Sequence, residues 1–203
     1  MNPFLTVWFK PKSTTNYVIE NKSVKYSIIL FIISSYTSTL NGLQEAGYIE
    51  GMSLLLVTGL ILISGPVFGF IGFYIGSWLF TLVGKWMNGT GTLEDMRKAI
   101  AVTAIPNVFI LPVLIIYILI YGEMYFQAPA WNEFSSIPLG ASLTLNVIMM
   151  TVGIWNIVIT SKMIGVVHNF SSWRGFGVSL VIGVSLAILF IPIILVIVGV
   201  SLM

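Results

Sequence analysis

The stretch MSLLLVTGLILISGPVFGFIGFYIGSWLFTLV, residues 52–83, decides how this chain folds. It holds no charged residue and is longer than the roughly 20 residues that an α-helix needs to cross a bilayer. Gly65, Gly69, Gly72 and Gly76 recur in it at spacings of four, three and four, so they fall on one stripe of a helix. Because glycines at this spacing let a second helix approach closely, we expect this helix to be the packing spine of a membrane protein.

The glycine stripe has two interpretations. It packs against another helix of this chain, or it is an exposed docking face for a second copy or for another membrane protein. The first apolar run offers small side chains for internal packing, because Ser34 and Ser38 lie on one of its faces. We favour internal packing.

The composition of the whole chain predicts the same class of protein. Of its 203 residues, 57% are hydrophobic and 8% are charged, whereas a soluble domain has about 25% charged residues. The chain has no cysteine and a single histidine, His168, which argues against thiolate or histidine metal sites. We expect no cofactor and no nucleic-acid partner, and we expect His168 to be a solvated or interfacial side chain.

Five apolar runs predict an all-α membrane protein with five transmembrane helices, at residues 24–40, 52–83, 100–121, 139–161 and 178–202. Together they make one transmembrane domain, residues 24–203. Residues 1–23 precede it as a cytoplasmic amphipathic segment in which aromatic side chains mix with lysines. Within this segment we expect Pro11 to end a first piece, and Ser13 to cap a short helix that ends at Asn21.

The positions of the basic residues predict the orientation of the helices. Lysine and arginine gather on the cytoplasmic side of membrane proteins, and five crossings with the N-terminus inside place all nine of them there. If residues 52–83 formed two short helices, the basic loop that follows them would lie outside. We therefore expect one long helix at residues 52–83 and a C-terminus on the outer side.

Two inner loops carry signals for the start of a helix. Thr92 precedes Glu94 and Asp95, so its hydroxyl is expected to cap a short amphipathic helix that leads into the third crossing. Ser171 and Ser172 open a similar segment ahead of the fifth crossing. The Gly-Thr-Gly loop before Thr92 lacks the pattern of a nucleotide-binding loop, so we expect no nucleotide there.

No ionisable residue lies deep inside a predicted span. Such residues normally carry proton relays and ion pathways, so their absence argues against proton-coupled transport and against an enzyme. The polar residues within the spans are uncharged. Among them, Asn107, Asn146 and Asn156 either form hydrogen bonds between helices or contribute to a polar ligand site.

Short motifs along most of the chain resemble a known family. They are Asn2-Pro3-Phe4 followed by Trp8 and Pro11, Thr14-Thr15 before the first span, Trp78 ahead of the Gly-Thr-Gly loop, Ile105-Pro106, and Trp155 ahead of Asn169-Phe170-Ser171-Ser172-Trp173-Arg174. The chain resembles the bacterial Yip-type proteins, relatives of the eukaryotic Ypt/Rab-interacting proteins.

The resemblance implies five transmembrane helices, a cytoplasmic N-terminus and a C-terminus across the membrane. Eukaryotic members of this family are linked to vesicle traffic and small GTPases, and some bacterial members accompany ABC exporters. Only 23 residues precede the first span here, whereas the eukaryotic region associated with GTPase contacts is long. This difference puts GTPase binding in doubt.

Two functional hypotheses follow. The first, which we favour, is a non-enzymatic scaffold or assembly factor in a cell membrane, expected to be a bacterial cytoplasmic membrane. It would bind the bilayer and another membrane protein such as an ABC exporter permease, or itself, through helix faces and the inner segments 92–101 and 171–177. The second is a small channel or transporter for a neutral or lipidic substrate, suggested by the hydroxyl face of the first span and by Asn146 and Asn156.

Overall fold

The computed structural model describes residues 1–46, 52–130 and 133–201, so residue 202, the predicted end of the last span, lies outside the described part. Within that part, the regular structure is helical and contains no strand, which confirms the all-α class. The elements are α1 (Pro3–Thr6), α2 (Pro11–Asn21), α3 (Val24–Ala46), α4 (Leu54–Trp86), α5 (Leu93–Ala99), α6 (Ala101–Tyr121), the 3-10 helix η1 (Gly122–Phe126), α7 (Leu139–Val167) and α8 (Ser172–Ser201).

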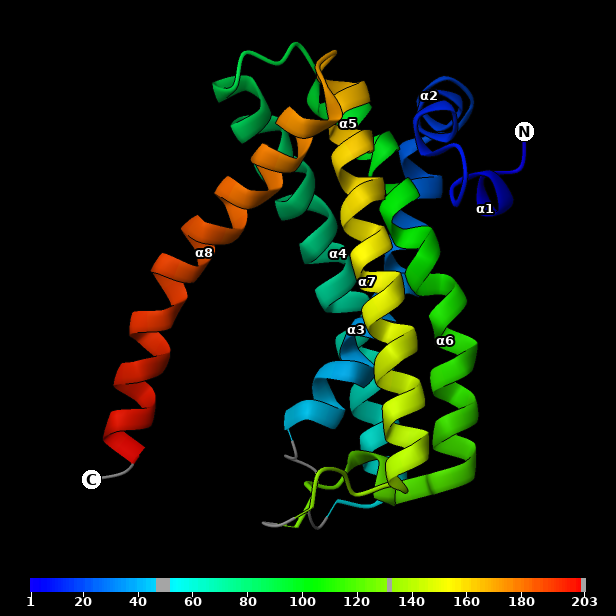
Figure 1. Ribbon diagram of the computed structural model, residues 1–203, viewed down its shortest axis with the longest axis vertical. Helices are drawn as coiled ribbons and strands as arrows, with labels where there is room; N and C mark the ends of the chain where they lie inside the picture. The colour runs from blue at the N-terminus through cyan, green and yellow to red at the C-terminus, as the bar shows by residue number, and fades with distance from the viewer. Residues whose placement is uncertain (47–51, 131–132, 202–203) are drawn as a thin grey trace.

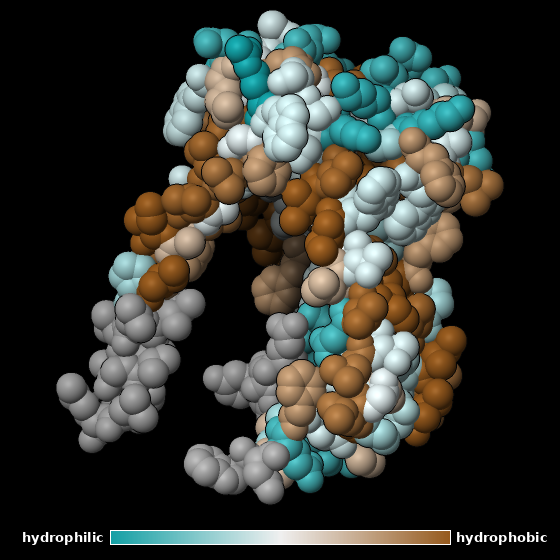
Figure 2. Space-filling view, viewed as in Figure 1, coloured by the Kyte–Doolittle hydropathy of each residue, from teal (hydrophilic) through white to brown (hydrophobic). Residues whose placement is uncertain are grey.

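The long helices α3, α4, α6 and α7 form a bundle from which α8 diverges (Figure 1). α3 packs against α4 and α6, and α6 packs against α7. α8 contacts α7 and α4, then runs away from them toward the end opposite α1 and α2 (Figure 1). Hydrophobic residues cover the middle of the molecule, hydrophilic ones gather at the end with α1 and α2, and the surface is hollowed between α8 and the bundle (Figure 2).

Several helices are suited to a membrane. Among the described residues, four helical segments are long and apolar enough to cross a bilayer: Leu55–Trp86, Leu93–Phe126, Leu139–Val167 and Ser172–Pro192. α3 is not one of the four, because its hydroxyl side chains make it less apolar than the others. The prediction of several apolar membrane helices is confirmed, whereas the count of five stays a prediction.

The uncharged stretch at residues 52–83 lies almost entirely in one continuous helix. α4 spans Leu54–Trp86 and includes Pro66 in its interior. The Ser53 hydroxyl accepts from the backbone N–H of Leu56 and caps its start. Residues 52–83 are therefore not split into two short helices.

The N-terminal segment is part of the folded core. Val7 and Val18 are fully buried, and Trp8 packs edge-to-face on Phe109 of α6 with ring centroids 5.7 Å apart. The expected helix start was wrong, because Pro11 is the first residue of α2 and Ser13 does not cap it. Proline suits that position, since the first N–H groups of a helix have no intrahelical acceptor.

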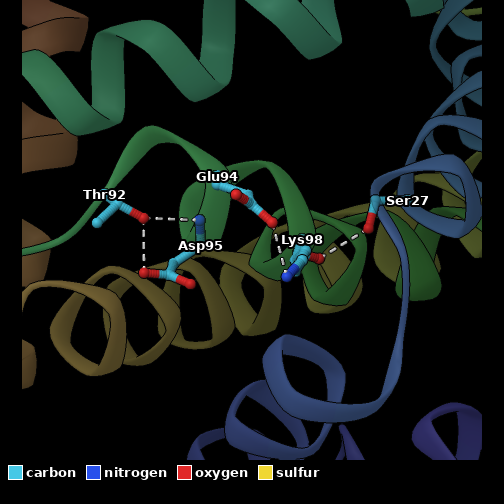
Figure 3. Close-up of polar contacts among 5 residues, drawn as sticks. All are labelled: Ser27, Thr92, Glu94, Asp95 and Lys98. Atoms are coloured by element: carbon cyan, nitrogen blue, oxygen red, sulfur yellow. Dashed lines mark hydrogen bonds and ion pairs between the residues drawn. The ribbon is translucent and has the colours of Figure 1, made fainter.

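The short helix α5 begins as its sequence predicts (Figure 3). The Thr92 hydroxyl accepts from the backbone N–H of Asp95 at 3.1 Å and donates to the carboxylate of the same residue at 2.6 Å. Lys98 forms an ion pair with Glu94 at 3.0 Å. The carbonyl of Lys98 accepts from the Ser27 hydroxyl of α3 at 2.8 Å, which ties this helix to the bundle.

The turn between α7 and α8 is shorter than the gap between the two predicted spans. α7 continues past residue 161 to Val167, and α8 begins at Ser172 rather than at residue 178. The Ser171 hydroxyl accepts from the backbone N–H of Arg174, as the predicted helix start requires. The helices extend beyond the apolar runs because intrahelical hydrogen bonds do not depend on side-chain polarity. Lys162 is therefore a residue of α7.

Candidate functional site

A groove of about 720 Å³ lies among α3, α4, α6 and α7. Its polar lining consists of hydroxyl and amide side chains: Ser34, Ser35, Ser38, Thr39, Ser64, Thr103, Asn107, Asn156 and Thr160. None of the described residues that line it is charged. The groove thus brings together six residues that the sequence singled out on four helices: Ser34, Ser38, Gly69, Gly76, Asn107 and Asn156.

The hydroxyls on α3 join this helix to its neighbours. Thr37 donates to the backbone carbonyl of Asn107 on α6 at 2.8 Å. The Ser35 oxygen lies 2.6 Å from the carbonyl of Gly65 on α4, and Ser34 donates within α3 to the carbonyl of Phe31. Because the protons of Ser34 and Ser35 have partners, these two groove hydroxyls offer acceptor oxygens to a ligand.

The side chain of Asn156 in the groove is only partly satisfied by hydrogen bonds. Its Nδ2 donates to the backbone carbonyl of Thr103 on α6 at 3.2 Å. Its Oδ1 is buried and has no hydrogen-bond partner among the described residues. An amide oxygen in apolar surroundings costs free energy while it lacks a donor, so this atom favours a bound group that carries an O–H or N–H.

Asn146 lies outside the groove. Its amide nitrogen donates to the carbonyl of Ser142, one turn earlier in the same helix, at 3.0 Å. We grouped Asn146 with Asn107 and Asn156 by sequence, but in the structure it is exposed and its hydrogen bond stays within α7.

No group of three His, Asp or Glu side chains that could hold a metal ion occurs in the described parts of the chain.

The glycine stripe faces the interior of the bundle. A Cβ added to Gly65 would lie 2.8 Å from the Tyr36 ring of α3. A Cβ on Gly69 would lie 2.5 Å from the Ser35 hydroxyl and 3.0 Å from the Cα of Ile32. At Gly72 and Gly76 the nearest atoms, on Phe31 and Ile100, would be in ordinary contact at 3.5 Å. Close approach of α3 and α4 thus depends on the first two glycines.

His168 was expected to be solvated or interfacial, and this prediction was wrong. Its side chain is 1% exposed and both ring nitrogens have partners. Nδ1 accepts from the backbone N–H of Gly91 at 3.2 Å, and Nε2 lies 3.1 Å from the carbonyl of Phe80. Because Nδ1 is the acceptor, the neutral ring carries its proton on Nε2 and donates it to Phe80.

Glycines and a second turn enclose the His168 ring. Cβ atoms added to Gly84 or Gly89 would collide with the ring, and a Cβ on Gly91 would collide with the adjacent Val167 and lie 3.0 Å from Nδ1. The Asn169 amide donates to the Thr90 hydroxyl at 3.0 Å, which joins the loop after α4 to the turn after α7. We call this arrangement of His168 with its three glycines the histidine clasp.

The electrostatic state of the clasp follows from its burial. Removal from water lowers the pKa of His168 below its ordinary value of 6.5. The hydrogen bond to Phe80 opposes this lowering of the pKa, and the positive charge of Lys85 adds to it.

Asparagine after a helix was the sequence signal for the two turns of the clasp. Asn88 and Asn169 each follow the end of a helix and adopt positive φ angles of 63° and 56°, a conformation in which asparagine is enriched.

Two comparisons with known proteins found no match: neither a curated protein nor a solved structure is significantly similar to this chain. A third comparison, with models of protein families, found the Yip1 domain over residues 5–200. The match begins within α1, covers α2 and continues through the long helices to residue 200. The chain therefore belongs to the Yip1-domain family and is a membrane protein with several apolar helices.

Proposed function

We propose that this protein is a non-enzymatic membrane protein that binds a neutral, lipid-like molecule in the groove among α3, α4, α6 and α7. The observation that carries this proposal is the buried, unpaired Oδ1 of Asn156. A hydroxyl or amide proton on the polar end of the ligand would donate to it, and apolar side chains such as Phe31 and Phe68 would receive the rest.

The groove favours an uncharged ligand. A charged head group within a bilayer needs a countercharge or water, and burying it alone is costly. The groove lining offers neither a cation nor an anion. A neutral amphiphile needs only hydrogen bonds there, which the hydroxyls and Asn156 can supply.

The topology that accompanies this proposal has five crossings, with α3 as the first. The N-terminus would lie in the cytoplasm and the C-terminus outside, in a bacterial cytoplasmic membrane. This orientation is supported by the nine basic residues, which then all face one compartment. It also agrees with the course of α8, which ends far from α1 and α2 (Figure 1).

A photoaffinity experiment tests the groove. The protein is placed in phosphatidylcholine nanodiscs with a diacylglycerol that carries a diazirine on one acyl chain, and labelled peptides are identified by mass spectrometry. We expect labelling of α4 and α7 beside the groove. Asn156→Leu should weaken this labelling about fivefold to tenfold, because it removes one hydrogen bond of about 1 kcal/mol or slightly more.

The chain offers a matched control on the same helix. Asn146→Leu makes the same chemical change outside the groove, so it should leave the labelling unchanged. A probe whose free hydroxyl is methylated should label the unaltered protein as weakly as the intact probe labels Asn156→Leu. Equal labelling by both probes, or an equal effect of both substitutions, would contradict the proposal.

A second candidate function is the scaffold for another membrane protein. Of the segments suggested for it, 92–101 packs partly into the bundle, since Met96 and Ala99 of α5 are buried, whereas 171–177 buries Gly175 against Ser161 and keeps Trp173 exposed. The observation that favours a scaffold is instead the divergent course of α8 (Figure 1). It leaves Val184, Ile188 and other apolar side chains of that helix uncovered.

Cross-linking would separate the two candidates. Because the chain has no cysteine, Ile188→Cys introduces a single thiol on α8. A scaffold should form a defined cross-linked product in native membranes, either with a second copy or with a membrane protein such as an ABC exporter permease. Products with lipid alone would count against the scaffold and leave the groove proposal intact.

A further inference from the structure

Lys162 lies within an apolar helix and has no acidic partner. It is half-buried on α7, five residues before that helix ends at Val167. The ion pair found among the described residues joins Glu94 and Lys98, and no described carboxylate lies within ion-pair distance of Lys162. An ammonium group in such a position extends toward the membrane surface and attracts an anion.

Lys162 lies between two hollows and contributes to the lining of both. The larger, about 650 Å³, lies between α7 and the end of α1, and Trp8, Phe9, Ile154 and Trp155 are among its lining residues. The smaller, about 370 Å³, lies between α7 and α8 and is lined by Ile157, Val158, Ser161, Ser172, Trp173 and Phe176 besides Lys162. Apart from the lysine, both linings are uncharged and mainly apolar.

The side chains around Lys162 are of the types that are found where lipid meets water. At 1.5 Å per residue, Lys162 lies about 8 Å from the end of α7, near the polar end of a membrane helix. At least one tryptophan lines each hollow, and tryptophan is enriched at the level of lipid head groups. Two further exposed cations follow directly in the chain, since Lys10 comes after Phe9 and Arg174 comes after Trp173.

We propose that Lys162 binds the phosphate of an anionic, two-chain phospholipid, with one acyl chain in each flanking hollow. The positive charges select the anionic head group. Two apolar hollows that meet at one cation match the shape of a lipid with two chains on one phosphate-bearing backbone. This site is separate from the groove, because none of the residues that line the groove contributes to either hollow.

Tryptophan fluorescence provides the test. The protein is reconstituted in phosphatidylcholine vesicles with increasing fractions of phosphatidylglycerol that carries brominated acyl chains, which quench nearby tryptophans. We expect saturable quenching, and weaker quenching by brominated phosphatidylcholine at the same fraction. Lys162→Gln should shift the phosphatidylglycerol curve about fivefold, since one basic side chain near a membrane contributes about 1 kcal/mol to anionic lipid binding.

Matched variants isolate the charge at this position. Lys162→Arg should keep the curve close to that of the unaltered protein. Lys12→Gln removes an exposed cation of α2 that lines neither hollow, so it should have little effect. Asn156→Leu should leave the curve unchanged, so failure of the groove proposal would not be mistaken for failure of this one.

Three results would overturn the proposal. Equal quenching by the two brominated lipids would mean that Lys162 and the tryptophans anchor the helix without selecting a head group. Loss of quenching with millimolar glycerol phosphate would indicate a site for a soluble phosphate compound. An unchanged curve for Lys162→Gln, with thermal unfolding like that of the unaltered protein, would show that the lysine does not bind the lipid.

Discussion

The histidine clasp and the groove both place a neutral polar side chain in apolar surroundings, but they satisfy it differently. In the clasp, both nitrogens of His168 have backbone partners, and three glycines leave no space around the ring. In the groove, Asn156 uses its nitrogen and leaves its oxygen unpaired beside a cavity. The clasp is a closed structural element, whereas the groove is suited to receive a ligand.

The contrast shows how to distinguish structural from ligand-binding polar groups in a membrane protein. A buried polar group whose partners all come from the chain holds helices together. One that keeps a free acceptor costs stability in the absence of a ligand. Substitutions should therefore damage the fold at the clasp and alter ligand binding at the groove.

The largest expected effect is at the clasp. Gly84→Ala should lower the free energy of unfolding by about 3 kcal/mol or more, because its Cβ would collide with the enclosed ring of His168. Unfolding in mixed micelles, followed by circular dichroism, measures this. Gly59→Ala is the control on the same helix, since a Cβ there meets no atom within 4 Å. Similar stabilities of the two variants would contradict the clasp.

The contact between α3 and α4 should show an intermediate effect. Gly69→Ala should cost about 2 kcal/mol in the same unfolding measurement, because its Cβ would press on the backbone of Ile32. Gly72→Ala should change stability by less than about 0.5 kcal/mol, since its Cβ would be in ordinary contact with Phe31. A cost at Gly72 equal to that at Gly69 would mean that the entire stripe supports the close approach.

Lowering the pH should weaken the clasp. The pKa of His168 is lowered in the folded protein, mainly by burial, so the unfolded chain binds a proton first as the pH falls through 6.5. Stability should therefore be full above this pH and decrease below it, until the folded form is protonated too. Protonated Nδ1 would also oppose the N–H of Gly91. His168→Gln should remove this part of the pH dependence in unfolding measurements between pH 5 and 8.

Only a small effect on stability is expected at the groove. Asn156→Leu removes one hydrogen bond to Thr103 and one unpaired oxygen, so the unfolding free energy should change by less than about 1 kcal/mol. Thermal unfolding without added lipid measures it. A loss as large as that of Gly84→Ala would assign Asn156 to the fold and remove the main argument for a ligand in the groove.

The sequence predicted those features that depend on neighbouring residues. The capping of α5 by Thr92 and the class of membrane helices follow from spacing and hydropathy within about 30 residues. The single helix α4 follows from the positions of the basic residues along the chain. The family resemblance rests on equally short motifs, and the match to the Yip1 domain confirms the family. Helix ends were less predictable, since Pro11 starts α2 and α7 passes residue 161.

The role of each polar residue depended on the tertiary structure. His168 meets Gly91 and Phe80 across 77 and 88 residues of chain, so its loop position could not show that it is buried. Asn146 and Asn156 are alike in sequence, but one bonds within its helix and the other faces α6 and the groove. Hydropathy and caps are properties of local sequence, whereas burial and hydrogen-bond satisfaction depend on which distant helices come together.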